Sequence, residues 1–373
     1  PDMASMIHNE MRKHGIKLIL GYTVEGFKGN DNGVEVLLKD NPSLQADMVV
    51  LAIGVTPDTV LAKEAGLELG IKESIVVNDR METSVPDIYA AGDAVQVKHY
   101  VTGNDALISL AGPANKQGRI IADNICGGDS RYLGSQGSSV IKVFDMTAAT
   151  TGINETNAKK SGLEVDTVIL SPMSHAGYYP GGKVMTMKVV FEKESYRLLG
   201  AQIIGYEGVD KRIDVLATAI HAGLNATQLK DLDLAYAPPY SSAKDPVNMA
   251  GFMIDNIAKG TLKQWHLEDM DKISKDKDVE LLDVRTVGEF SRGHIDGFKN
   301  IPVDELRERI SEIEKGKPVY LICQSGLRSY IASRILEGNG YETYNFSGGF
   351  RFYDAVVNDR ALIERAYACG MDY

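Results

Sequence analysis

The segment VYLICQSGLRS, Val319–Ser329, constrains the fold of its domain more than any other part of the chain. A run of apolar residues leads into Cys323, and four residues separate that cysteine from Arg328, where a helix-like pattern begins. Such a run is typical of a buried strand, and a short connection to a helix is typical of a parallel α/β domain. Cys323 is therefore either a buried residue that ends a core strand or a nucleophile inside a ring of backbone donors.

The rest of the chain divides into regions of different pattern. From Val279 onward, short apolar runs alternate with helical patterns, which predicts a small α/β domain with a parallel sheet. The polar stretch before it, residues 259–278, is typical of a linker. Between residues 138 and 259, strand-like runs precede helices, which predicts an α+β unit. The helices are expected at 209–221, 227–232 and 247–259, and a helix is also expected within DELRERISEI.

The N-terminal part reads as a piece of a nucleotide-binding domain. A helix ends at Gly15, and strands are expected at 16–20, 33–40 and 47–54, the last a continuous apolar run typical of a buried strand. Further strands are expected in IVVND and DIYAAGDAV, followed by a helix from about Pro113 to Cys126. This order resembles the second half of a nucleotide-binding domain.

Composition excludes several classes of function. The 373 residues carry 40 basic and 51 acidic side chains, a net charge of −11, without a basic stripe for nucleic acid. No apolar stretch reaches the length of a membrane span, and no signal peptide is visible. The three cysteines form no CxxC pair, which favours a reducing compartment such as the cytoplasm and argues against a disulfide scaffold. No metal site is expected.

The residues after Cys323 are suited to holding an anionic sulfur. Gly326 permits the positive φ angle that a tight loop requires. The following helix N-terminus contributes partial positive charge and Arg328 a full one, which together favour a thiolate and an anionic persulfide. The amides expected to surround the sulfur belong to Gln324, Ser325, Gly326 and Leu327.

Several motifs of the last hundred residues resemble the rhodanese family in order and spacing. Four residues between Cys323 and Arg328 is the loop length associated with sulfur transfer, whereas related cysteine phosphatases have five. The resemblance implies that Arg328 holds a persulfide or a substrate anion. It also implies structural, loop-bracing roles for Asp283, Arg285, Glu289 and His294. The matching motifs are Asp283-Val284-Arg285, Glu289-Phe290, Gly293-His294-Ile295, Ile301-Pro302 and Gly348-Gly349.

Three earlier segments resemble flavin-dependent pyridine nucleotide-disulfide oxidoreductases that use a single redox cysteine. They are LAIGVTPDT, TSVPDIYAAGDAV and LAGPANKQGRIIADNI. The resemblance implies that Asp93, after Gly92, binds the ribityl chain of FAD, and that Gly54 lets the backbone approach the nicotinamide nucleotide. It also places a helix N-terminus near the flavin pyrimidine edge. That N-terminus consists of Ala111, Gly112, Pro113 and Ala114.

Within that group, SHAGYYPGG and DLAYAPPYSSAKDPVNMAG are similar to coenzyme A-disulfide reductases with a fused rhodanese domain, also described as NADH-dependent persulfide reductases. The His-Glu pair of two-cysteine relatives is not recognisable. The resemblance implies a homodimer in which Tyr240, acting across the subunit boundary, and one of Tyr178 or Tyr179 protonate or orient a thiolate. The alternative is that these tyrosines only pack a proline-rich interface. His221, Cys126 and Cys369 are expected to have no catalytic role.

The expected architecture is α/β and contains four segments. Residues 1–72 are the C-terminal half of an NAD(P)H-binding domain and 73–134 the second segment of an FAD-binding domain, both Rossmann-like. Residues 135–260 form an α+β dimerisation domain and 261–373 a rhodanese-like α/β domain. Neither a GxGxxG fingerprint nor a flavin-proximal redox cysteine is present, so we expect the chain to begin partway through the protein.

The expected activity is reduction of coenzyme A persulfide, polysulfide or coenzyme A disulfide, dependent on NAD(P)H and FAD. Cys323 would accept sulfane sulfur as a persulfide, and coenzyme A would carry it. One alternative is an NADH oxidase- or peroxidase-like flavoprotein whose rhodanese-like domain serves only substrate docking or regulation. Another is a disulfide reductase in which that domain only docks substrate. The sequence does not distinguish NADH from NADPH.

Overall fold

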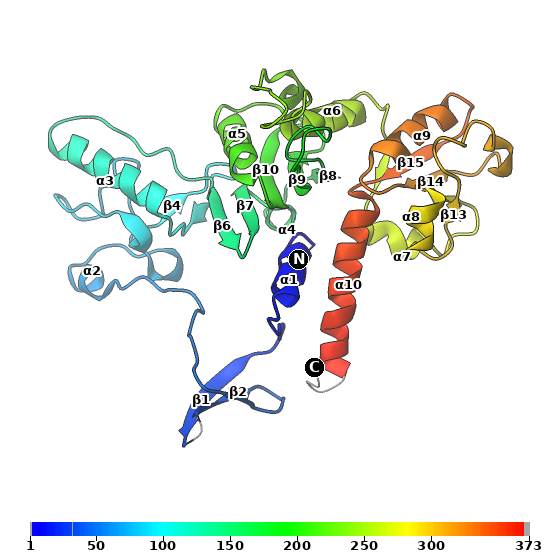
Figure 1. Ribbon diagram of the computed structural model, residues 1–373. Helices are drawn as coiled ribbons and strands as arrows, with labels where there is room; N and C mark the ends of the chain where they lie inside the picture. The colour runs from blue at the N-terminus through cyan, green and yellow to red at the C-terminus, as the bar shows by residue number, and fades with distance from the viewer. Residues whose placement is uncertain (1, 32, 369–373) are drawn as a thin grey trace. The chain divides into compact units, whose positions relative to one another are not determined.

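The structure, a computed structural model, describes residues 2–31 and 33–368 (Figure 1). Contacts divide the chain into two units, Pro1–Glu10 with Ser138–Asn358 and Met11–Gly137 with Asp359–Tyr373. Among the described helices, none is long and apolar enough to cross a membrane. The described residues also contain no group of three or more His, Cys, Asp or Glu side chains that could hold a metal ion.

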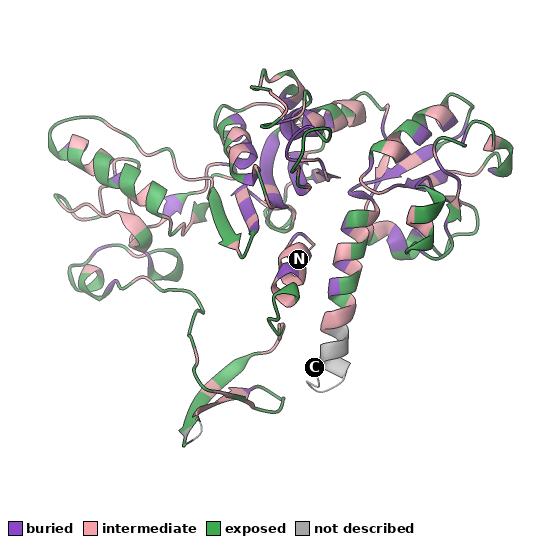
Figure 2. Cartoon of the chain, viewed as in Figure 1, coloured by how far each residue is buried: buried purple, intermediate pink, exposed green. Residues whose placement is uncertain are grey.

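The first unit contains an antiparallel five-stranded sheet, the central sheet, with strand order β6-β7-β10-β9-β8. Strands β9 and β10 are almost wholly buried (Figure 2), and α5 packs against β7 and β10. The predicted α+β unit is confirmed, although the helix expected at 227–232 is the 3-10 helix η3. The elements are β6 (Ser139–Val143), β7 (Met146–Gly152), α4 (Glu155–Lys160), β8 (Val165–Leu170), β9 (Met185–Glu192), β10 (Leu198–Gly205), α5 (Val209–His221), η3 (Ala226–Asp231) and α6 (Pro246–Ala258).

The same unit contains a second five-stranded sheet, the C-terminal sheet, with order β11-β15-β14-β12-β13. All its strand pairs are parallel, as predicted. The chain must therefore cross over between neighbouring strands, and α9 packs against β14 and β15. The elements are β11 (Gln264–Trp265), η4 (Leu267–Asp269), α7 (Met270–Ile273), β12 (Glu280–Asp283), α8 (Val287–Ser291), β13 (Lys299–Asn300), η5 (Ile310–Glu312), β14 (Val319–Ile322), α9 (Leu327–Glu337), β15 (Thr343–Phe346) and α10 (Gly349–Ala368).

Two expectations for this region are wrong. The polar stretch expected to be a linker contains β11, and Trp265 is buried against the rings of Phe346 and Phe298. The segment DELRERISEI is a series of turns ending in η5 rather than a helix. The Tyr341 hydroxyl hydrogen-bonds to the carbonyls of Ile310 and Ile313, so tertiary contacts replace the helical hydrogen bonds there.

Partly and fully buried contacts join the two sheets of this unit. Strand β8 is the edge of the central sheet, and the carboxylate of its Asp166 accepts hydrogen bonds from Gln264 and His266 at 3.0–3.2 Å. The Ile169 N–H donates to Ser347 Oγ at 3.1 Å. A buried apolar cluster completes the junction, formed by Met3, Met146, Ala148, Ile169, Ile204, Phe352 and Val356.

In the second unit, the helix expected at 113–126 is confirmed as α3, and the strand at 33–40 as β2. The runs 16–20 and 47–54 form no strand, and in the latter Val50 and Ile53 are 76% and 85% exposed. A buried strand needs hydrogen-bonded neighbours, and no described segment pairs with these runs. IVVND and DIYAAGDAV form only isolated bridges. The elements are α1 (Ala4–Lys13), which spans both units, β1 (Val24–Asn30), β2 (Gly33–Leu38), β3 (Leu44–Ala46), α2 (Val60–Glu64), η1 (Ile71–Glu73), η2 (Gly92–Ala94), β4 (Val97–Lys98), β5 (Asp105–Ala106) and α3 (Ala111–Ile125).

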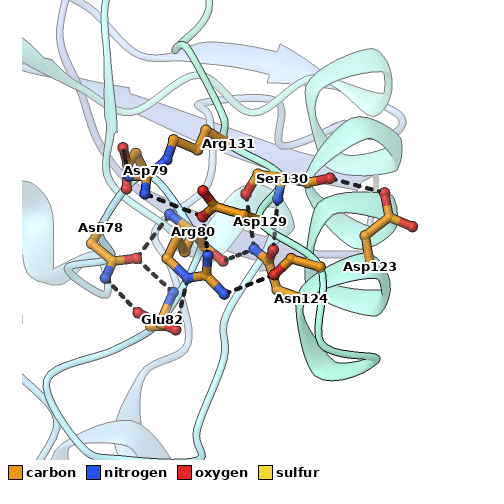
Figure 3. Close-up of polar contacts among 10 residues, drawn as sticks. Asn78, Asp79, Arg80, Glu82, Asp123, Asn124, Asp129, Ser130 and Arg131 are labelled. Atoms are coloured by element: carbon orange, nitrogen blue, oxygen red, sulfur yellow. Dashed lines mark hydrogen bonds and ion pairs between the residues drawn. The ribbon is translucent and has the colours of Figure 1, made fainter.

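A polar network holds the C-terminal end of α3 (Figure 3). Asn124, which is buried, donates to the carbonyls of Arg80 and Ser130 and accepts from the Ser130 N–H at 2.8 Å. The Arg80 guanidinium also pairs with Glu82 and Asp129. Because these bonds fix the helix at its far end, they also fix the direction in which its N-terminus points.

Candidate active site

Cys323 lies at the carboxyl end of β14 and has no exposed surface. Its Sγ accepts a hydrogen bond from the Gly326 N–H at 3.1 Å and one from the Ser329 hydroxyl at 3.2 Å. Gly326 has a φ of 99° and caps the N-terminus of α9, so the sulfur faces the positive end of that helix. Of the amides predicted to surround the sulfur, that of Gly326 donates to it. Ser329 was not predicted.

The Ser329 hydroxyl has two acceptors within reach, Cys323 Sγ and the Gly326 carbonyl at 3.1 Å. One hydroxyl proton serves one acceptor at a time. An anionic sulfur is the stronger acceptor, so ionisation of the thiol favours the bond to sulfur. A serine directly after the loop arginine is a signal that the sequence offered, because the first turn of a helix faces its N-cap.

The N-terminus of α10 supports the loop from behind. The Phe350 N–H donates to the Cys323 carbonyl at 2.7 Å, and the Arg351 N–H donates to the Gln324 carbonyl at 3.1 Å. Gly349, with a φ of 69°, lies so close that a Cβ there would be 2.7–2.8 Å from loop backbone atoms. The double glycine therefore allows the N-terminal amides of α10 to bind the carbonyls of the Cys323 loop. The amides of the loop itself remain available to the sulfur.

Arg328 is paired with Glu289 rather than free. Two parallel hydrogen bonds of 2.7 Å join its guanidinium to the two carboxylate oxygens. These bonds lower the pKa of Glu289 to about 2 and raise the pKa of Arg328. Glu289 also completes a capping box with Thr286 at the start of α8. The role predicted for Arg328, holding an anion, remains a prediction, while the bracing role of Glu289 has a visible contact.

Asp283 and Arg285 form a second, wholly buried pair beside the loop, with oxygen–nitrogen distances of 2.6–3.0 Å. The Arg285 guanidinium lies 3.8 Å from the centre of the Phe350 ring and donates to the Gly293 carbonyl at 2.8 Å. A planar cation suits both contacts. This pair therefore connects β12 to the first turn of α10. His294 is exposed and its Nδ1 lies 3.1 Å from the Phe290 carbonyl.

A second candidate site is a pocket of about 620 Å³ beside the central sheet. The Tyr178 hydroxyl lies 2.8 Å from the Tyr236 hydroxyl, a contact that raises the pKa of Tyr236. The Tyr179 ring instead packs edge-on against His175. Tyr240 lines the pocket and is 72% exposed, whereas Tyr236 was not predicted. The lining residues are Ser174, His175, Glu207, Gly208, Lys211, Arg212, Ala235, Tyr236, Ala237, Pro239 and Tyr240.

A buried ion pair shapes this pocket. The Arg212 guanidinium, 1% exposed, binds the Asp245 carboxylate at 3.0–3.5 Å. It also donates to the carbonyls of Ser174 and Tyr240. Asp245 in turn caps α6, whose first residue is a proline. The pair therefore fixes the backbone on both sides of the pocket, and SHAGYYPGG and DLAYAPPYSS meet there.

The predicted flavin-contacting residues lie together in the second unit. Gly92 has a φ of 84° and donates its N–H to Gln117 Oε1, a buried side chain of α3 that was not predicted. Asp93, in η2, is exposed. No side chain caps the first turn of α3, where Ala111 and Gly112 are exposed and Pro113 and Ala114 follow. An exposed carboxylate beside an uncapped helix N-terminus fits hydroxyl and carbonyl groups of a flavin.

The remaining predicted residues are less well placed. Gly54 has a φ of 96° but lies in the exposed run 47–54, so its role at a nicotinamide nucleotide remains a prediction. Cys126 is exposed at the end of α3, and His221 is exposed at the end of α5. Cys369 lies outside the described residues.

Family models match three successive parts of the chain. Residues 1–118 match pyridine nucleotide-disulphide oxidoreductase, residues 138–246 its dimerisation domain, and residues 266–355 the rhodanese-like domain. The chain therefore belongs to the pyridine nucleotide-disulphide oxidoreductases and carries a C-terminal rhodanese-like domain.

The known proteins that are similar to this chain include two of solved structure and one curated relative. Reduced CoADR-RHD of Bacillus anthracis has a TM-score of 0.92 and 46% identity. The match covers 96% of the present chain and 64% of the CoADR-RHD chain. The NAD-dependent persulfide reductase of A. fulgidus has a TM-score of 0.86 and 39% identity. This match covers 94% of the present chain and 64% of the reductase chain. The NAD(P)H sulfur oxidoreductase (CoA-dependent) of Pyrococcus abyssi is 36% identical over 246 residues, 66% of this chain and 54% of its own length. The chain thus spans little more than half of that curated relative.

Proposed function

We propose that this chain is part of an enzyme that reduces coenzyme A persulfide, polysulfide or coenzyme A disulfide with NAD(P)H and FAD. The observation that carries the proposal is Cys323 Sγ, held by the Gly326 amide and the Ser329 hydroxyl at the start of α9. The names of the similar proteins support the substrate class. The dimerisation-domain match supports a homodimer, and the sparse cysteines support a cytoplasmic location.

At Cys323 the proposed step is transfer of one sulfane sulfur. The thiolate attacks the outer sulfur of a donor R–S–SH, and the S–S bond of the donor breaks with its electron pair left on R–S⁻. That group takes the proton, so the products are the Cys323 persulfide and R–SH. Coenzyme A thiol then removes the outer sulfur by the same exchange. The Gly326 N–H and the helix N-terminus stabilise the anionic sulfur throughout.

At the pocket lined by Tyr236 and Tyr240, the hydrogen-bonded hydroxyls of Tyr178 and Tyr236 would protonate or orient the thiolate that leaves on reduction. Their hydroxyls share one hydrogen bond, so one hydroxyl can donate its proton to the thiolate while the other donates a hydrogen bond to that hydroxyl. Tyr240 remains a candidate because it lines the same pocket. Bound FAD would supply the electron transfer from NAD(P)H to sulfur, and Asp93 with the first turn of α3 would hold it.

The test measures NADH-dependent sulfide release from polysulfide, in the presence of coenzyme A, by the complete enzyme and its Cys323→Ser variant. We expect the variant to lose release from polysulfide donors that must load the rhodanese-like domain, while direct reduction of coenzyme A disulfide persists. Equal turnover of both proteins with every sulfur donor would remove Cys323 from the pathway. If oxygen consumption exceeded sulfide release for both, the oxidase alternative would replace the proposal.

A further inference from the structure

The entrance to the Cys323 site carries less positive charge than its motif indicates. Arg328 interacts electrostatically with Cys323, but both branches of its guanidinium are bound to the Glu289 carboxylate. Glu289 remains ionised far below neutral pH, because its pKa is lowered to about 2. Arg328 therefore offers a neutral ion pair, rather than a free cation, to a molecule that approaches the sulfur.

Exposed apolar side chains follow the Cys323 loop along α9 and lie near Glu289 on α8. Leu327, which directly follows the loop glycine, is 65% exposed, and Ile331, one turn along α9, is 44% exposed. Residues four apart lie on the same face of a helix. Val287, two residues before Glu289 on α8, is 62% exposed. Because Cys323 has no exposed surface, a sulfur donor has to enter the loop to reach its Sγ, and Leu327 directly follows that loop.

We propose that Glu289 and the apolar side chains Leu327 and Ile331 set the donor specificity of this site. They favour an organic persulfide carried on an uncharged chain over an inorganic dianion such as thiosulfate. This inference rests on the proposed function, since it assumes that Cys323 accepts sulfane sulfur. Thiosulfate leaves as sulfite, which carries two negative charges that the neutralised Arg328 does not stabilise. A persulfide leaves as a thiol whose chain contacts the apolar residues.

The experiment compares two donors, pantetheine persulfide and thiosulfate, by the rate at which the complete protein forms a persulfide on Cys323. Glu289→Gln is the informative variant, because glutamine can retain the capping box with Thr286 while losing the charge. We expect its kcat/KM for thiosulfate to rise about tenfold, as one hydrogen bond from a partly buried charged group would allow, with that for pantetheine persulfide changed less than threefold. Glu312→Gln is the matched control, since Glu312 forms a similar ion pair with Arg309, and it should alter neither rate.

Leu327→Ser and Ile331→Ser provide the complementary test. Each should lower kcat/KM for pantetheine persulfide several-fold and leave thiosulfate unchanged. The inference is overturned if Glu289→Gln changes both donors equally or neither, while the unmodified protein still forms the Cys323 persulfide. If no persulfide forms on Cys323 with any donor, the proposed function itself fails.

Discussion

Replacing Gly349 by alanine should distort the Cys323 loop without touching the cysteine. Gly349 has a φ of 69°, which alanine adopts at a cost of about 1–2 kcal/mol. Its new Cβ would also lie 2.7 Å from the Ser325 nitrogen and 2.8 Å from the Cys323 carbonyl oxygen. Both atoms are backbone, so relief requires the loop or the start of α10 to move, at a further cost of roughly 1–3 kcal/mol.

Gly340→Ala separates the two contributions. Gly340 belongs to the same domain and has a φ of 83°, but an added Cβ there would meet nothing within 4 Å. It therefore carries the backbone cost alone, about 1–2 kcal/mol. The difference between the two variants measures how tightly α10 holds the Cys323 loop.

The assay combines urea unfolding with the rate of persulfide formation on Cys323. Gly349→Ala should lose about 1–3 kcal/mol more stability than Gly340→Ala and should form the persulfide at least tenfold more slowly, because the Gly326 amide moves away from the sulfur. Gly340→Ala should keep its rate. Equal stability losses with equal rates would show that the loop does not depend on the end of α10.

Three other predictions follow from the contacts described. Asp245→Asn should lower the free energy of unfolding by about 3–5 kcal/mol, because buried Arg212 loses its counter-charge. Urea titration measures this change, and a loss below about 1 kcal/mol would contradict the burial of the pair. In stopped-flow assays, Tyr178→Phe should slow NADH-dependent persulfide reduction about 100-fold, whereas Tyr179→Phe should leave its rate unchanged. A slow Tyr179→Phe variant beside an unaffected Tyr178→Phe variant would assign the proton donor to Tyr179. Because the pKa of Glu289 is depressed, its pair with Arg328 contributes stability above pH 4.5 that is lost as pH falls toward about 2; a carboxyl ¹³C resonance that titrates near 4.5 would show that the pair is absent in solution.

The sequence predicted the strand–loop–helix at Cys323 because every local signal there agrees. The apolar run before Cys323, the glycine at position 326 and the helical pattern after it each favour the same structure. By contrast, the partner of Arg328 comes from a segment 39 residues earlier. A spacing rule identifies an arginine that can hold an anion, but it does not show that a carboxylate of the same chain already occupies it.

The exposed run 47–54 shows the limit of reading burial from composition. Its apolar residues predict a buried strand, yet a strand is defined by hydrogen bonds to neighbours, and none of the described segments provides them. The Tyr178–Tyr236 contact shows the opposite case. Two tyrosines 58 positions apart carry no sequence signal of their own, but Arg212 and Asp245 hold both of their segments at one pocket.

Ser347, which directly follows β15, connects the Cys323 loop to the neighbouring sheet. The structure buries it, and its hydroxyl accepts the Ile169 N–H of β8. The next two residues are Gly348 and Gly349, at the start of α10, whose first amides bind the carbonyls of the Cys323 loop. Phe352, in the same turn, packs in the apolar cluster that contains Ile169. One stretch of six residues thus holds both the Cys323 loop and the edge of the central sheet.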